Sequence, residues 1–248
     1  MTPIANMNMY TAGMRKSIQD KLWFLDKVAD KVDSMVDYGC ADGALLYEIH
    51  NLYPSIRLYG YDNNVEMLQR ASTLCQFATY SQRTIKAPSS ISLLIASSVI
   101  HEIHSYSADI KSEYSNIFDS GYRYIAIRDM FYTKDAVRKT DENKLAAVLR
   151  NEPTSRVQSF ERFHGSLAEN VNFLHYLLKY RYTENWEREV RENYFPQSLE
   201  EFLSQIPQKY KIVSVHAYSL PFTKERVHKD FGFWLEDTTH AKILLEKI

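Results

Sequence analysis

The segment Ser34 to Leu46, SMVDYGCADGALL, constrains the fold of this chain more than any other. In it, a short apolar run is followed by a turn that contains glycines, and a helix-forming stretch comes directly afterwards. We predict that the first strand ends at Asp37, that Gly39 lets the backbone turn sharply, and that Gly43 lets a ligand approach the next helix. A parallel α/β sheet holds a nucleotide-like ligand at a turn of this kind.

A second acid follows at the expected distance. Asp62 closes the next apolar run, LYGYD, twenty residues after Asp42. At this position an acid accepts hydrogen bonds from the two hydroxyls of a ribose. The ordered set DYGCADG and GYD resembles motif I and the following acidic motif of the class I S-adenosylmethionine-dependent methyltransferases, and the resemblance covers about residues 21–129.

A dinucleotide-dependent dehydrogenase is the competing interpretation, because it also uses a glycine-rich turn and an acid at the second strand. Its fingerprint is G-x-G-x-x-G, whereas this turn has Ala41 between its two glycines and carries acids at Asp37 and Asp42. Carboxylates repel a pyrophosphate but suit the ammonium group of an aminoacyl sulfonium. The turn therefore favours S-adenosylmethionine as the cofactor, with S-adenosylhomocysteine as the product.

The alternating periodicities predict one doubly wound α/β domain over residues 1–248. We expect strands at about 34–37, 56–61, within 77–85, 91–96, 122–128, 212–218 and 241–245. We expect helices at about 17–29, 44–52 and 65–74. The resemblance implies a three-layer Rossmann-like sandwich, whose mostly parallel seven-stranded sheet ends in a C-terminal antiparallel hairpin.

The span of about 130–196, after the fifth strand, is too long for a linker. Apolar residues recur in it at helical spacing, which indicates a helical insertion within the domain. Because open α/β sheets bind ligands outside the carboxyl ends of their strands, this insertion is expected to form a lid over the acceptor pocket. The spacing of Ser198 and Glu201, S-x-x-E, predicts a capping box at the next helix.

The segment SSVIHEIHSY follows the fourth strand and resembles the part of the family that lines the methyl-transfer site. His101 suits a general base or an acceptor-orienting group near neutral pH, and Glu102 either fixes His101 or contacts the substrate. A histidine that is hydrogen-bonded to the backbone at a helix start is the structural alternative. His101, Glu102 and His104 lack the further partners that a metal site needs, so none is expected.

The end of the fifth strand, IAIRDM, is the second place where a catalytic charge is expected. Arg128 suits a carboxylate or phosphate on the acceptor, and a salt bridge at the strand end is the alternative for Arg128 and Asp129. Substrate contacts are predicted for Tyr10, Tyr180 and Trp186. The last two belong to a stretch that interleaves aromatic and basic residues, whose alternative role is a packed core.

Eleven residues around the two motifs and the end of the fourth strand are expected to bind the cofactor. They are Asp37, Tyr38, Gly39, Cys40, Ala41, Asp42, Gly43, Asp62, Asn63, Ser97 and Ser98.

Composition and charge limit the functional classes that remain possible for this protein. The net charge of −1 and the pI of about 6.7 give no long-range field toward nucleic acid or an anionic membrane. Two cysteines without disulfide or metal spacing, and the absence of a signal-peptide or membrane-span pattern, favour a cytoplasmic protein with no membrane partner. We expect a methyltransferase for a small anionic or aromatic acceptor. An RNA methyltransferase and a non-catalytic S-adenosylmethionine-binding module are the alternatives.

Overall fold

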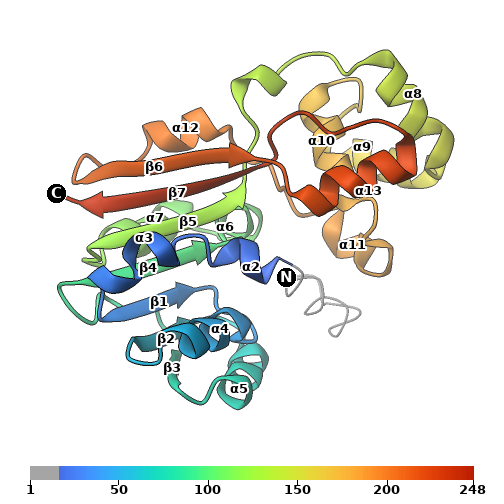
Figure 1. Ribbon diagram of the computed structural model, residues 1–248. Helices are drawn as coiled ribbons and strands as arrows, with labels where there is room; N and C mark the ends of the chain where they lie inside the picture. The colour runs from blue at the N-terminus through green and yellow to red at the C-terminus, as the bar shows by residue number, and fades with distance from the viewer. Residues whose placement is uncertain (1–16) are drawn as a thin grey trace.

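The structure is a computed structural model of the chain, and its description covers residues 17–248. Seven strands form one sheet. They are β1 (Ser34–Tyr38), β2 (Arg57–Tyr61), β3 (Ala78–Ser81), β4 (Ser92–Ser97), β5 (Tyr124–Met130), β6 (Tyr210–Tyr218) and β7 (His240–Lys247). The strand order is β3-β2-β1-β4-β5-β7-β6, and β7 pairs antiparallel with both β5 and β6, whereas the other neighbouring strands pair parallel (Figure 1). The predicted fold class is confirmed.

Helices cover both faces of the sheet. In the part outside the insertion they are α2 (Ile18–Lys21), α3 (Leu25–Val28), η1 (Ala29–Lys31), α4 (Ala44–Leu52), α5 (Val65–Leu74), α6 (Ile100–Tyr106), α7 (Ile110–Phe118) and α12 (Leu199–Ser204). One hydrophobic cluster joins α6, α7 and α12 to the sheet, and a second joins α3 and α4 to its other face. Every residue of β1 and β4 is buried, as expected for parallel strands covered on both sides.

The prediction of one continuous helix at about 17–29 is wrong. A turn at residues 22–24 separates α2 from α3. The break allows two different placements of neighbouring side chains. Phe24, Leu25 and Val28 pack into the cluster on the sheet, whereas Lys21 lies at the carboxyl edge of the strands and lines the cavity described below.

The insertion is helical, as predicted, and forms a layer beyond the carboxyl ends of the parallel strands (Figure 1). Its helices are η2 (Lys134–Ala136), α8 (Glu142–Asn151), α9 (Thr154–His164), α10 (Asn170–Lys179), η3 (Thr183–Asn185) and α11 (Trp186–Glu189). The connection between β6 and β7 adds α13 (Pro221–Phe231), which shares the insertion's hydrophobic cluster through Val227 and Phe231. We call these helices together the lid.

Local sequence signals explain where several helices begin. Ser198 and Glu201 form the predicted capping box at the start of α12. The Asn64 side chain accepts hydrogen bonds from two backbone N–H groups at the start of α5. Across residues 17–248, none of the helices combines the length and the apolar composition needed to cross a bilayer.

Candidate active site

A cavity of about 510 Å³ lies between the carboxyl edge of the sheet and the lid. On the sheet side its wall includes Gly39, Asp62, Ser97, His101 and Arg128. On the lid side its wall includes Tyr182, Arg188, Glu192 and Phe222. The topology explains this meeting, because β1, β2, β4 and β5 are parallel neighbours that all end at this edge.

The turn after β1 has the geometry that its glycine predicted. Gly39 has a φ of +80°, and a Cβ added there would lie 3.0 Å from Val99 Cγ2. Asp62 holds the rest of the turn through its two carboxylate oxygens. Oδ2 accepts the N–H of Ala41 at 2.9 Å and Oδ1 accepts the N–H of Asn64 at 2.9 Å. The acid predicted for a ribose is therefore also a structural support of the turn.

Gly43 is needed for packing inside the protein. It lies at the start of α4 with a φ of +76°. A Cβ added to it would lie 2.9 Å from Tyr80 Oη and 3.0 Å from Ala71 Cβ. Its absent side chain lets α4 approach α5 and β3, which is a different reason from the ligand approach that the sequence suggested.

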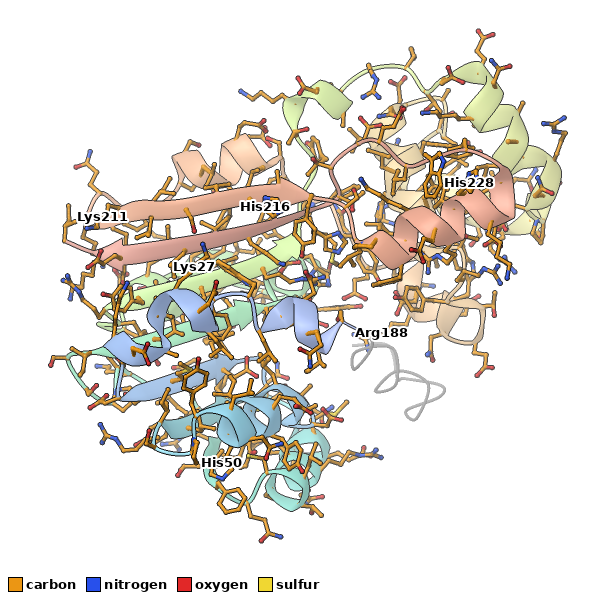
Figure 2. All side chains as sticks on the ribbon, in the orientation of Figure 1. Lys27, His50, Arg188, Lys211, His216 and His228 are labelled. Atoms are coloured by element: carbon orange, nitrogen blue, oxygen red, sulfur yellow. The ribbon has the colours of Figure 1, made fainter. Side chains whose placement is uncertain are left out.

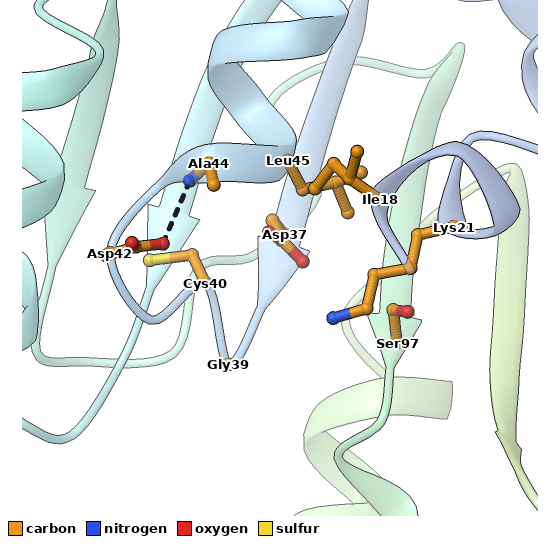
Figure 3. Close-up of a pocket in the computed structure, with 9 residues that line it drawn as sticks. All are labelled: Ile18, Lys21, Asp37, Gly39, Cys40, Asp42, Ala44, Leu45 and Ser97. Carbon is orange, nitrogen blue, oxygen red and sulfur yellow. Dashed lines mark hydrogen bonds between the residues drawn. The ribbon is translucent and has the colours of Figure 1, made fainter. Parts of the chain in front are cut away.

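Lys21 is a site residue that sequence reasoning missed. Its side chain points between Asp37 and Ser97 in a small pocket that also includes Cys40 and Asp42 (Figure 3). Burial lowers the pKa of Lys21, and the nearby Arg128 adds to this effect. Burial also raises the pKa of Asp37 to about 7. A signal was available, because one continuous helix would have placed the charged Lys21 on the apolar face of Leu25 and Val28.

His101 is held firmly from the side that faces away from the lid. Its Nδ1 lies 2.6 Å from Asp129 Oδ1, and Asp129 Oδ2 accepts the N–H of Ile100 at 2.6 Å. The other ring nitrogen, Nε2, lies 3.4 Å from Glu192 Oε1. Burial opposes a charged imidazole, but Asp129 and Glu192 outweigh it and raise the pKa of His101 to about 10. Carboxylates on both sides, not the backbone, hold this ring.

Glu192 is a second residue that sequence reasoning missed. It reaches the end of β4 from the segment that follows α11, and its side chain is only 3% exposed. Arg188 Nη2 lies 3.6 Å from Glu102 Oε1 and 3.9 Å from Glu192 Oε1, at the junction of lid and sheet (Figure 2). Burial, and then the neighbouring Glu192, raise the pKa of Glu102 to about 7. The available signal was an acid close to the apolar Val190 and Tyr194.

Arg128 forms the strand-end salt bridge that the sequence offered as one of its two roles, and the other role, binding an anionic acceptor, stays a prediction. Its Nε donates to Asp20 Oδ2 at 3.0 Å, which is the salt bridge at the strand end, and its Nη1 donates to Ser98 Oγ at 2.9 Å. The third nitrogen, Nη2, is buried and has no hydrogen-bond partner among the described residues. Ser97 Oγ, on the same cavity wall, is also buried without such a partner.

Several predicted site residues point elsewhere. The Tyr38 hydroxyl donates to Glu113 of α7, on the face of the sheet that α6, α7 and α12 cover. Tyr180 is 2% exposed and its hydroxyl donates to Asp230, so it belongs to the lid core. Tyr10 lies outside the described residues.

Trp186 packs edge-on against Tyr176 within the same lid core. Its neighbour in sequence, Asn185, and the more distant Tyr182 line the cavity in its place. His104 pairs with Tyr114 on the other side of α6 and does not join His101. The aromatic and basic stretch of the lid is therefore divided, with Tyr176, Tyr180 and Trp186 in the lid core and Arg181, Tyr182 and Arg188 on the cavity wall.

Comparison with solved structures shows that the chain has the fold of the class I methyltransferases. An S-adenosylmethionine-dependent methyltransferase from Anabaena variabilis matches 100% of this chain and 96% of its own, with a TM-score of 0.51 and 9% identity. The plantazolicin methyltransferase BpumL, in complex with SAH, matches 97% and 89%, with a TM-score of 0.50 and 11% identity. The [4+2]-cyclase SpnF matches 93% and 81%, with a TM-score of 0.53 and 10% identity. No protein-family model and no curated protein matches the chain in sequence.

Proposed function

We propose that this protein is an S-adenosylmethionine-dependent methyltransferase that acts on a small-molecule acceptor. The observation that carries the proposal is one continuous cavity. It joins the glycine turn and Asp62 on the sheet to the lid residues that face them. The sheet edge supplies the place for the methyl donor, and the lid supplies the place for the acceptor.

The donor half contains groups that fit each part of S-adenosylmethionine. Asp62 keeps lone pairs for the ribose hydroxyls beside the turn that it supports. Ser97 Oγ and Arg128 Nη2 are buried on the same wall, have no hydrogen-bond partner within residues 17–248, and suit the amino-acid end of the cofactor. Lys21 adds a positive charge there and Asp37 a negative one, which matches a zwitterion.

The chain's main contribution to transfer is orientation. When bound, the cofactor supplies a methyl group on a positively charged sulfur, so the donor is already activated. Holding an acceptor atom about 3 to 3.5 Å from that methyl group contributes roughly 7 to 11 kcal/mol toward the barrier. His101 and Glu102 lie on the cavity wall directly after β4, where they would orient the acceptor or hold its proton.

The position of the cavity between the sheet edge and the lid favours a small molecule over a polymer. Arg181, one of the basic residues that suggested RNA binding, forms an ion pair with Asp230. Arg188 lies beside two carboxylates inside the cavity wall. Because the [4+2]-cyclase SpnF has the same fold, cofactor binding and methyl transfer are tested in separate experiments.

Calorimetric titration of the ligand-stripped protein with S-adenosylmethionine, and with NAD as the control, is the first test. We expect saturable binding of S-adenosylmethionine alone, weakened at least about tenfold in Asp62→Ala, because a charged hydrogen-bonding partner is lost. Asp26→Ala, at an exposed acid, should bind as the wild type does. Binding of NAD instead would support a dehydrogenase, and binding of neither would overturn the proposal.

Transfer itself is then measured with a labelled methyl group and a pool of small metabolites, with total RNA as a second acceptor. Label in small molecules supports the proposed function, and label in RNA supports the alternative. Tight binding of S-adenosylmethionine with no transfer would indicate the non-catalytic module or a different reaction on the same fold.

A further inference from the structure

Three potential metal ligands meet where the sheet and the lid face each other. One ligand atom from each of His101, Glu102 and Glu192 can be chosen so that all three lie within 4.8 Å of one another. All three residues line the cavity. The first two follow β4 and the third comes from the lid, so only the folded chain assembles the group. This contact supplies the partner that the sequence did not reveal.

The orientation of His101 is the one that a metal ligand requires. Asp129 engages Nδ1 at 2.6 Å and is itself held by the N–H groups of Ile100 and Met130. Nε2 is thereby directed toward Glu192. Metal-binding histidines commonly bond a carboxylate through the nitrogen that does not bind the metal, and this bond fixes both the tautomer and the ring direction.

The surroundings of Glu192 are an independent indication that this group binds a cation. Glu192 Oε1 is buried, and the two cationic groups that face it, His101 Nε2 at 3.4 Å and Arg188 Nη2 at 3.9 Å, form ion pairs without hydrogen-bonding geometry among the described residues. A buried carboxylate oxygen left in this state costs free energy. The segment that carries it is not free to turn away, because Lys179 Nζ donates to the backbone carbonyls of Glu189 and Glu192. A cation between the three ligands would satisfy this oxygen.

More carboxylates than side-chain cations surround the three ligands. Asp129, Glu102 and Glu192 supply three carboxylates, whereas Arg188 beside the last two and Lys179 at the Glu192 carbonyl supply two cations. A further cation therefore suits this place. The guanidinium lies 3.6 and 3.9 Å from the two carboxylates, so it balances their charge from one side of the group.

We propose that His101, Glu102 and Glu192 bind a divalent transition-metal ion, with its remaining coordination positions open to the cavity. One imidazole nitrogen with two carboxylate oxygens suits Mn²⁺ or Zn²⁺ better than Mg²⁺, which prefers oxygen ligands and water. Metal binding stands independently of the methyltransferase proposal. The ion's role rests on that proposed function, and it would be to polarise an oxygen of the acceptor.

The test uses the metal-stripped protein and Mn²⁺ alone, followed by electron paramagnetic resonance, with Zn²⁺ measured by calorimetry. We expect one ion per chain for at least one of the two metals. Glu192→Gln and His101→Gln should weaken binding at least about tenfold. His104→Gln is the matched control, because this histidine lies one turn further on the same helix and pairs with Tyr114. It should bind metal as the wild type does.

Two results would overturn the metal site. One is that neither Mn²⁺ nor Zn²⁺ binds the folded wild type, and the other is that binding persists unchanged in the Glu192 and His101 variants. If Glu192→Gln does not fold, as judged by its thermal unfolding, Glu102→Gln replaces it, since that side chain is 32% exposed and should tolerate the change. S-adenosylmethionine binding, measured on the same samples, tests the proposed function separately.

Discussion

Two non-glycine residues on the cavity wall have left-handed backbone conformations. Ala41 has a φ of 44° and Ser98 a φ of 59°. Such conformations cost free energy in any residue with a Cβ, and they collect at functional sites, where the surrounding structure enforces them. At Ala41 the enforcement is visible, because its N–H is held by Asp62.

We expect Ala41→Gly to stabilise the protein slightly. Removing the Cβ relieves about 1 to 2 kcal/mol of left-handed strain, and the more flexible unfolded chain offsets about 0.5 to 1 kcal/mol of that gain. Urea unfolding should therefore show a free energy of unfolding higher by up to about 1 kcal/mol. Ala44→Gly, in the first turn of α4, is the control and should lose about 0.5 to 1 kcal/mol. Equal losses in both variants would show that Ala41 is unstrained.

At the scale of elements, one buried lysine organises the part of the lid that faces the sheet. Lys179, at the end of α10, is 0% exposed and donates to the carbonyls of Glu189 and Glu192. Its Nζ lies 3.8 Å from the centre of the Tyr194 ring. Burial lowers the pKa of Lys179 to about 8. The lysine thus ties α10 to the segment that carries Glu192.

Lys179→Met keeps the length of the side chain but leaves two buried carbonyls without a donor. Each such loss costs about 1 to 3 kcal/mol, so we expect the free energy of unfolding, measured in urea, to be about 2 to 6 kcal/mol lower than in the wild type. Lys229→Met, at an exposed position of α13, should change it by less than about 0.5 kcal/mol. A loss as small at Lys179 would mean that the carbonyls find water when the lysine is gone.

The packing of α9 makes the lid sensitive to acid. His164 Nε2 donates to the carbonyl of Val190 at 2.8 Å, and the ring packs against Phe160 and His175. Burial lowers the pKa of His164 to about 4, and the charge of Lys179 adds to this effect although the bond to Val190 opposes it. Between pH 6.5 and 4, His164 binds a proton in the unfolded chain but stays neutral in the folded chain. Stability is therefore lost as the pH falls through this window.

His164→Gln keeps a donor for the Val190 carbonyl and removes the titration. We expect the stability advantage of the wild type over this variant to shrink as the pH falls from 6.5 toward 4. Unfolding in urea at several pH values measures this difference, and the contributions of titrating groups distant from His164 largely cancel because both proteins contain them. A difference that stays constant over the window would show that His164 is not held neutral.

At the scale of the whole molecule, the parts that the sequence predicted are the local ones. The strands and the turn at Gly39 follow from apolar runs and from a glycine whose φ is positive, and both are properties of short segments. Lys21 and Glu192 were missed because their importance arises only when distant segments meet. Helical spacing placed Tyr180 on an apolar face, but it could not say that the lid's own core covers that face.

One carboxylate joins four distant segments of the fold. Asp20, in α2, accepts hydrogen bonds from Arg128 on β5 and Tyr218 on β6, and it forms an ion pair with Lys242 on β7 at 2.6 Å. It thereby anchors α2 over the sheet edge where Lys21 reaches the cavity. Burial opposes the charged form of Asp20, but its hydrogen bonds to Lys242 and Tyr218 prevail and lower its pKa.

Asp20→Asn has nearly the same shape but leaves Arg128, whose side chain is 4% exposed, without its counter-charge. Breaking a buried pair in this way costs about 3 to 5 kcal/mol. The second cation, Lys242, also loses its counter-charge. We expect a loss near the lower end of that range in urea unfolding at pH 7, since Asp20 itself is 21% exposed. Glu66→Gln, which breaks the exposed pair with Arg70, should cost less than about 1 kcal/mol. Similar losses in the two variants would mean that the buried network does not anchor α2, and that packing of the apolar residues around it holds this helix over the cavity.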